Sequence, residues 1–319
     1  MFGRSRPVLP TNLEEFRRAR NRRDPGASQT ASSPVEFESL IIDVTEHISL
    51  NEDRSRSVYR ASTVVVGLGQ SQEEAGSLRP FDVVLKVGYH KAQHRYIKRE
   101  AEIYEKYFCT PEIKGQHVPN YLGLFLGDTY EGITTVLVLQ DSAFPLNYPL
   151  EHYSLDFRLD VINALAAVHK AGVTLPDFYE GNVVVKKWPG QTHYVPMIVD
   201  FACACPHTCE LELKEDEDVV PEPYIPEPST DVFPCSDMGD ACKRAQLWLP
   251  RGYWFGTTVP LHDAIDPDKL LTHPCPEPSL RGNRGLRGRA IAEANRLREW
   301  LRNRRKWDAE PPAPLDFDD

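Results

Sequence analysis

The order in which strand-like and helix-like runs follow one another restricts the fold of this chain more than any other feature. Runs rich in β-branched and aromatic residues occupy positions 40–44, 58–66, 81–87 and 134–140, with polar or glycine-containing turns between them. Between the last two runs, residues 92–107 carry apolar side chains at the spacing of an amphipathic helix. The pattern predicts a small sheet with one helix, followed by a mainly helical region, and therefore an α+β fold.

The helical region is expected to begin with residues 155–171, where apolar side chains recur at helical spacing and Gly172 follows as a C-terminal cap. Two short apolar runs come next, 183–187 and 195–200, on either side of a Trp-Pro-Gly turn. They predict a β-hairpin whose second strand ends on Asp200.

The remainder of the chain carries weaker patterns. Residues 203–280 are rich in proline and acids, and only 237–249 has the spacing of a helix. The last predicted helix is 289–307, in which an apolar stripe is expected to pack while the arginines face solvent. That stripe contains Ile291, Ala294, Leu297, Trp300 and Leu301.

Length and charge exclude several classes of protein. The 319 residues are enough for a core that needs no disulfides, and the seven cysteines are expected to be free thiols. With no signal peptide and no apolar run of membrane-spanning length, we expect a soluble, cytoplasmic protein, with the nucleus as the alternative. The net charge of −10 argues against a dedicated nucleic-acid binder, although the basic ends keep nucleic-acid association as a weaker alternative.

Four parts are expected along the chain. They are a disordered basic arm at 1–34, a β-rich lobe at 35–142, a helical lobe at 143–307 and an acidic tail at 308–319. The arm contains one candidate for a short helix, 12–20. Its arginines are typical of a solubilising tail, and a nuclear-import signal or a phosphate contact is the alternative.

Asp177 and Asn182 lie five positions apart, between the helix 155–171 and the predicted hairpin, and Asp200 ends that hairpin. A carboxylate in such a loop can orient or deprotonate a hydroxyl, and an asparagine oxygen can bind Mg²⁺ without adding charge. We expect the hairpin to bring Asn182 and Asp200 together, where both could hold a metal ion bound to phosphates.

Lys86 lies within an apolar strand, where an isolated ammonium group is costly and a carboxylate partner is expected. Glu100, on the predicted helix that follows, is the natural candidate. A lysine held in this way can bind the phosphates of a nucleotide, and positioning and charge neutralisation supply most of the catalysis in phosphoryl transfer.

Five segments carry these residues in chain order: VVLK from Val83, REAEIYEKY from Arg99, VLVLQDS from Val136, AGVTLPDFYEGNVVV from Ala171 and IVDFA from Ile198. Together they resemble the protein-kinase-like superfamily, in its divergent form known from filamentous and mushroom-forming fungi. The resemblance extends over about residues 40–202. It implies a two-lobed fold, with a small β-rich N-lobe containing one helix and a mainly helical C-lobe.

The resemblance also implies a role for each residue in an ATP- and Mg²⁺-dependent phosphotransferase. Lys86 would anchor phosphates with Glu100 as its partner, Asp177 would be the catalytic base, and Asn182 and Asp200 would bind Mg²⁺. The residues expected beside adenine are the gatekeeper Leu139 and the hinge residues Gln140, Asp141 and Ser142. A protein Ser/Thr hydroxyl is the expected acceptor, and a small molecule is the variant.

Departures from the family pattern leave a second function open. The stretch 49–62 has no glycine where the family has a glycine-rich loop, so backbone amides cannot approach phosphates as closely, although Arg54, Arg56 or Ser57 could substitute. Leu175-Pro176 replaces the His-Arg pair before Asp177. The alternative is therefore a pseudokinase that binds nucleotide or partners without turnover.

One further group of residues invites a metal site: Cys203, Cys205, His207 and Cys209, with Cys235 and Cys242 as additional donors. Structural zinc sites usually pair ligands two to four residues apart on a turn. The alternation of the first two cysteines is more typical of one face of a buried strand. The buried strand is the favoured interpretation, and a zinc site is the alternative.

Overall fold

The computed structural model describes residues 17–18, 39–50, 56–66, 81–129, 132–141, 143–187, 194–211, 223–274 and 284–315. The chain divides into two compact units. The first comprises Met1–Ala143 with Ile198–Cys205, and the second comprises Phe144–Met197 with Pro206–Asp319.

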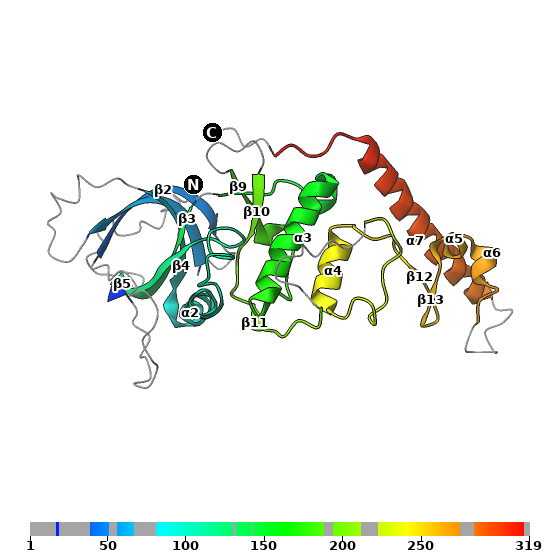
Figure 1. Cartoon of the computed structure of the whole chain (residues 1–319), viewed down its shortest axis with the longest axis horizontal. Coiled ribbons are helices and arrows are strands. Elements are labelled where there is room, and N and C mark those ends of the chain that lie inside the picture. The colour runs from blue at the N-terminus through cyan, green and yellow to red at the C-terminus, as the bar shows by residue number, and fades with distance from the viewer. Residues whose placement is uncertain are drawn as a thin grey trace, which may run out of the picture. The chain divides into compact units, whose positions relative to one another are not determined.

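A six-stranded antiparallel sheet forms the body of the first unit, in the order β1-β5-β6-β4-β3-β2 (Figure 1). Its strands are β1 (Arg17–Arg18), β2 (Ser39–Leu50), β3 (Arg56–Val66), β4 (Phe81–Tyr89), β5 (Tyr121–Thr129) and β6 (Gly132–Gln140). The helix α2 (His90–Tyr107) follows β4 directly and packs on β4, β5 and β6. Where the structure describes the first unit, one sheet and one long helix make up its body.

Alternating side chains give this sheet a buried face. The core on the sheet comprises Tyr59, Ala61, Val83, Leu85, Val87, Tyr89, Phe125, Val136 and Val138. Leu85 and Val87 point into this core, so the intervening Lys86 projects to the other side of β4. The period of two along the strand thus decides which face of the sheet receives the lysine.

The four strands and the helix expected in this region are confirmed, most of them with longer bounds. β5 was not predicted, because its sequence YLGLFLGDT interrupts the apolar alternation with two glycines. Gly123 adopts a φ of 157° beside a shift in the β5–β6 register. The helix expected at 12–20 is wrong at Arg17 and Arg18, which pair with β5 as strand β1. The other residues of the arm 1–34 lie outside the described residues.

The second unit contains most of the helices. Its strands are β7 (Ala143–Pro145), which starts at the unit boundary, β8 (Val173–Thr174), β9 (Val183–Lys187), β10 (Tyr194–Ile198), β11 (Cys205–Pro206), β12 (Gly252–Trp254) and β13 (Thr257–Val259). Its α-helices are α3 (Leu155–Lys170), α4 (Ser236–Arg244), α5 (Leu261–Ala264), α6 (Pro267–Leu270) and α7 (Arg284–Ala309). Short 3₁₀ turns occur at Leu150–His152 and Glu180–Asn182. The observed class is α+β, with a β-rich N-terminal region followed by helices.

The ends of α3 follow from local chemistry. The Ser154 hydroxyl accepts a hydrogen bond from the Phe157 N–H at 3.3 Å and caps the start of the helix. Gly172 has a φ of 90° and donates to the His169 carbonyl, which confirms the predicted glycine cap. The predicted hairpin is present, because β9 pairs with β10, but its second strand ends at Ile198 and not on Asp200.

Helix α4 is shorter than the helix expected at 237–249. Gln246 takes a left-handed φ of 50°, and the N–H groups of Gln246 and Leu247 donate to the carbonyls of Lys243 and Cys242. These two bonds form a Schellman motif, which ends the helix at Arg244. The buried Arg158 guanidinium on α3 then donates to the Ala245 and Gln246 carbonyls at 2.8 and 3.2 Å.

The stripe through which α7 packs overlaps only in part with the one expected, since Ala294 and Leu297 are buried but Trp300 and Leu301 are only half-buried. The buried apolar residues of α7 are Leu286, Ala290, Ala294 and Leu297, which form a cluster with residues of β12, β13, α5 and α6. Ile291 is 42 % exposed, whereas Arg304 is only 7 % exposed and donates to the Tyr224 hydroxyl. The expectation that all its arginines face solvent is therefore wrong at Arg304.

The end of α7 lies two residues inside the predicted acidic tail, because the helix continues to Ala309. Beyond it, the Ala313 N–H donates to the His152 carbonyl. Across the described residues, no helix is both long and apolar enough to cross a bilayer.

Candidate functional site

A lysine and two carboxylates form an ionic cluster in the first unit. The Lys86 ammonium lies 2.7 Å from Oε1 of Glu100 and 3.1 Å from Oδ1 of Asp200. The predicted ion pair between Lys86 and Glu100 is thus present. The Glu100 side chain is 2 % exposed, whereas that of Asp200 is 51 % exposed. One carboxylate is therefore fixed in the interior, and the other can reach a ligand.

Strand β4 and helix α2, which carry Lys86 and Glu100, pack closely against each other. Gly88, two residues after Lys86 on β4, faces α2 so closely that a Cβ atom there would lie 2.7 Å from Cδ1 of Ile97. Glu100 is also fixed from the other side, because its Oε1 accepts a hydrogen bond from the Phe201 N–H at 3.3 Å. The Phe201 ring packs edge-on against Phe108, with 4.7 Å between their centroids. Aromatic packing thus anchors the residue that follows Asp200.

Asp200 has a backbone conformation that is unusual for a residue with a side chain. Its φ of 68° lies in the left-handed region, which aspartate tolerates better than most residues. Such conformations cost free energy and cluster at functional sites. In this structure, the residue with the left-handed conformation is the one whose half-exposed carboxylate contacts Lys86.

The charges of the cluster shift one another's pKa values. Burial tends to lower the pKa of Lys86, but Glu100 and Asp200 outweigh it and the pKa is raised. Lys86 is the main reason that the pKa of Asp200 is lowered, and Arg56 contributes to the same effect. Burial raises the pKa of Glu100, although Lys86 opposes this effect. The charged lysine and the ionised Asp200 are the stable forms at neutral pH.

A pocket of about 230 Å³ lies beside this cluster. It is lined by Arg56, Ser57, Val58, Lys86, Val87, Tyr96, Ile97, Glu100, Asp200 and Ala202, all of the first unit. Sites for drug-sized ligands usually span about 300–1,000 Å³, so this volume suits a phosphate group better than a whole nucleotide. The Ser57 hydroxyl is buried and has no hydrogen-bond partner among the described residues. It is a polar atom that a ligand oxygen could satisfy.

The residues expected beside adenine are largely occupied by contacts within the protein. Leu139 is buried in β6, and the N–H groups of Gln140 and Asp141 donate to the carbonyls of Asn120 and Asp82. The Asp141 carboxylate forms an ion pair with Arg60. Ser142 lies outside the described residues. An adenine ring beside Gln140 and Asp141 would therefore find both of their N–H groups already bonded within the protein.

Asp177 and Asn182 belong to the second unit. Asp177 is exposed, in the loop that follows β8. Asn182 is buried, and its Oδ1 accepts a hydrogen bond from the Tyr179 N–H at 3.0 Å, which closes the 3₁₀ turn before β9. One lone pair of that oxygen remains for another partner. The expected site residues thus fall into two groups, with Lys86, Glu100 and Asp200 joined in the first unit.

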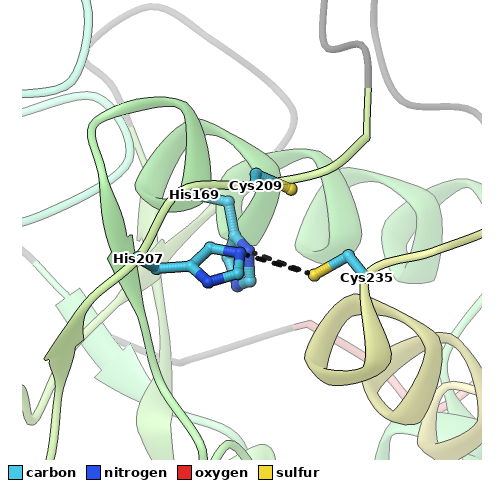
Figure 2. A group of neighbouring side chains, drawn as sticks. All are labelled: His169, His207, Cys209 and Cys235. Carbon is cyan, nitrogen blue, oxygen red and sulfur yellow. Dashed lines mark hydrogen bonds between the residues drawn. The ribbon is translucent and has the colours of Figure 1, made fainter.

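A second cluster lies within the second unit, formed by His169, His207, Cys209 and Cys235. One ligand atom from each side chain lies within 4.8 Å of the others. Figure 2 shows the two imidazole rings and the sulfur of Cys235 facing one another, with Cys209 beside them. Burial, and then the neighbouring His207, lower the pKa of His169 to about 4, and burial raises the pKa of the Cys209 thiol to about 11. In the absence of a cation, both groups are therefore neutral.

Only part of this cluster was visible in the sequence. His207 and Cys209 were candidates, and Cys235 was named as an additional donor, but His169 was read as part of a helix with a packed face. The structure leaves Cys203 and Cys205 out of the cluster. Cys203 is exposed and Cys205 is half-buried, so the expectation that they share the face of a buried strand is wrong. Cys205 instead contacts the Arg99 guanidinium at 3.4 Å.

Comparison with known proteins gives no independent assignment for these two clusters. No model of a protein family matches the chain, and no curated protein matches it.

Proposed function

We propose that the chain is an ATP- and Mg²⁺-dependent phosphotransferase of protein-kinase-like type, with a two-lobed fold and a protein Ser/Thr hydroxyl as its acceptor. The observation that carries the proposal is the Lys86 ammonium held between the buried Glu100 and the half-exposed Asp200, beside a phosphate-sized pocket. A lysine in this setting keeps its charge and its position, as phosphate binding requires.

The groups around the pocket fit the triphosphate and its metal ion. Arg56 and Lys86 supply positive charge, and the Ser57 hydroxyl supplies a polar atom without a described partner. Asp200 offers carboxylate oxygens, which are the hard ligands that Mg²⁺ prefers. When bound, Mg²⁺ neutralises charge on the phosphates.

In this proposal each residue has a separate role. Glu100 orients Lys86, and Lys86 would bind phosphate oxygens. Asp200 and Asn182 would hold the metal ion through a carboxylate and an amide oxygen, and Asp177 would accept the proton of the attacking hydroxyl. A bond forms from that hydroxyl oxygen to the γ-phosphorus, and the bond to the oxygen that leaves with ADP breaks.

Transfer of labelled phosphate from ATP to a pool of Ser/Thr-containing peptides tests the proposal. We expect the Asp177→Asn chain to lose at least about a thousandfold in turnover, since it removes the base and one charge at the reacting atoms. Asp268→Asn is the matched control, because the Asp268 side chain is 74 % exposed and forms an ion pair with the exposed Arg287 of the second unit. Equal transfer by the wild-type and Asp177→Asn chains would overturn the proposal.

Two observations favour a pseudokinase as the second candidate. The pocket of about 230 Å³ is small for a nucleotide, and the N–H groups of Gln140 and Asp141 are bonded within the protein. A thermal-shift titration separates the candidates, because ATP at a hundredfold excess over its Kd stabilises the folded chain by about 2.7 kcal/mol. Stabilisation by ATP-Mg²⁺ without transfer of phosphate identifies a nucleotide-binding pseudokinase. No stabilisation at millimolar ATP identifies a scaffold.

A further inference from the structure

The four residues of the second cluster come from three separate segments of the second unit. His169 lies in the last turn of α3, His207 and Cys209 follow β11, and Cys235 is the N-cap of α4. The Cys235 side chain makes no capping hydrogen bond to its helix. The helix start instead presents a sulfur atom to the two imidazole rings, in a position where the helix dipole favours negative charge.

The spacing of the donor atoms matches a tetrahedral metal site. Sγ of Cys235 lies 3.6 Å from Nδ1 of His169 and 3.7 Å from Nε2 of His207. Zinc binds sulfur at about 2.3 Å and nitrogen at about 2.1 Å, so a tetrahedral arrangement separates the two donors by about 3.6 Å. A single ion could therefore bind all three atoms with little movement of the side chains, and Cys209 supplies a fourth donor.

Hydrogen bonds among the four side chains do not account for the cluster equally well. The S–H group is a weak donor, and Sγ of Cys235 contacts the two imidazole nitrogens only at 3.6 and 3.7 Å. His169 and Cys235 are buried, and contacts this weak offset little of the cost of burying their polar atoms. The convergence of two imidazoles and two thiols therefore points to a ligand that binds all four.

The donor set also selects the kind of ion. Two thiolates and two neutral imidazoles around a divalent cation give a site without net charge, which suits its burial. Sulfur and imidazole ligands in a tetrahedron favour zinc over magnesium or calcium, which prefer oxygen. Four protein ligands leave no open position for water or substrate, as in structural sites.

We propose that His169, His207, Cys209 and Cys235 bind one structural Zn²⁺ ion, which joins the end of α3 to the start of α4 through the segment after β11. This site is separate from the proposed phosphotransferase chemistry, and either can fail without the other. The ion forms bonds to the two sulfur atoms as their protons leave to solvent, and no oxidation or reduction takes place.

Elemental analysis of the full chain, purified under reducing conditions without a histidine tag, provides the first test. We expect about one zinc per chain, and less than a tenth of that in Cys235→Ser. Cys203→Ser and Cys109→Ser are the matched controls, because both cysteines are exposed and lie outside the cluster. Zinc-free wild-type chain that gains no zinc when the metal is added would overturn the proposal, as would full zinc content in Cys235→Ser.

Cobalt substitution supplies a second test, whose decisive result comes from the wild-type chain. The chain is stripped with a chelator and titrated with Co²⁺, whose absorption reports tetrahedral geometry and thiolate bonds. We expect both kinds of band at one equivalent, and in Cys209→Ser about half of the sulfur-to-cobalt intensity. If the wild-type spectrum shows octahedral cobalt, or mass spectrometry of the unreduced chain finds a Cys209–Cys235 disulfide, the site is not a metal centre.

Discussion

The two clusters hold polar groups away from water in opposite ways. In the first unit, the charged Lys86 lies between a buried carboxyl group and a half-exposed carboxylate. In the second unit, the cluster consists of two imidazoles and two thiols, of which His169 and Cys209 are neutral without a cation. In these two clusters, the exposure of the site differs with the type of donor atom. The oxygen-bearing cluster keeps one side accessible for a ligand that comes and goes, whereas the sulfur and nitrogen cluster is arranged for a ligand that stays.

The largest effect is expected from removal of the metal. If the second cluster holds a permanent ion, a chelator should destabilise the wild-type chain by about 4 kcal/mol relative to zinc present at a thousandfold excess over its Kd. Denaturant unfolding with and without chelator measures this difference. Cys235→Ser serves as control, since it should respond little to the chelator. An equal response would assign the effect to another metal or to the chelator itself.

The next largest effect concerns the charges of the first cluster. Lys86→Met leaves Glu100 buried without a cation, so we expect a loss of about 3 kcal/mol in the free energy of unfolding. The double variant Lys86→Met/Glu100→Leu removes both charges and should recover most of that loss without restoring phosphate transfer. Lys98→Met, on the exposed face of α2, is the control. A double variant no more stable than Lys86→Met would contradict the role of the ion pair.

A smaller effect is expected where backbone spacing sets the first cluster. Gly88→Ala places a methyl group 2.7 Å from Cδ1 of Ile97 and 3.1 Å from Cβ of Gln93, so the buried Ile97 side chain must move and α2 must give slightly, at a cost of about 1–3 kcal/mol. Turnover should fall as well, because Glu100 moves with the helix. Gly288→Ala is the control, since a Cβ atom there meets nothing within 4 Å. Unchanged stability and turnover in Gly88→Ala would show that the helix adjusts freely.

The smallest effect concerns Arg56, which lines the pocket and lies in the stretch 49–62 that contains no glycine. Arg56→Gln removes a positive charge that lines the pocket and contributes to the lowered pKa of Asp200. We expect the KM for ATP to rise about tenfold, in line with about 1.5 kcal/mol for a hydrogen bond to a charged group. Arg95→Gln, on the exposed side of α2, should leave the KM unchanged. Equal KM values for the wild-type and Arg56→Gln chains would place the phosphates elsewhere.

The sequence predicted the first cluster better than the second for a physical reason. Lys86 and Glu100 lie on a strand and a helix with clear periodicity, so their faces could be inferred from spacing. Zinc ligands that come from three loops and helix ends have no such period. Only His207 and Cys209 are neighbours in the chain, and His169 resembled any residue on a packed helix.

The remaining errors have local causes. Glycines within β5 interrupted its alternation, so the strand was missed. Helix α4 ends early at the left-handed Gln246. The sequence did not indicate this end, because the capping position is usually taken by glycine or asparagine. Arg304 was expected in solvent, but its guanidinium lies over the Tyr224 ring, 5.5 Å from the ring centroid, and donates to the Tyr224 hydroxyl. Burial of a long cationic side chain depends on a distant partner that sequence spacing does not reveal.

The meeting of Cys209 and Cys235 has a consequence for how this chain can change in length. The two residues pin both ends of the segment 210–234 to one point, so the segment contributes to chain entropy as a closed loop. The free energy of closing such a loop rises only with the logarithm of its length, by about 0.6 kcal/mol for each doubling. Insertions and deletions in the acid-rich part of this segment, 210–222, should therefore be tolerated far better than a change at either cysteine or at Tyr224, whose hydroxyl accepts a hydrogen bond from Arg304.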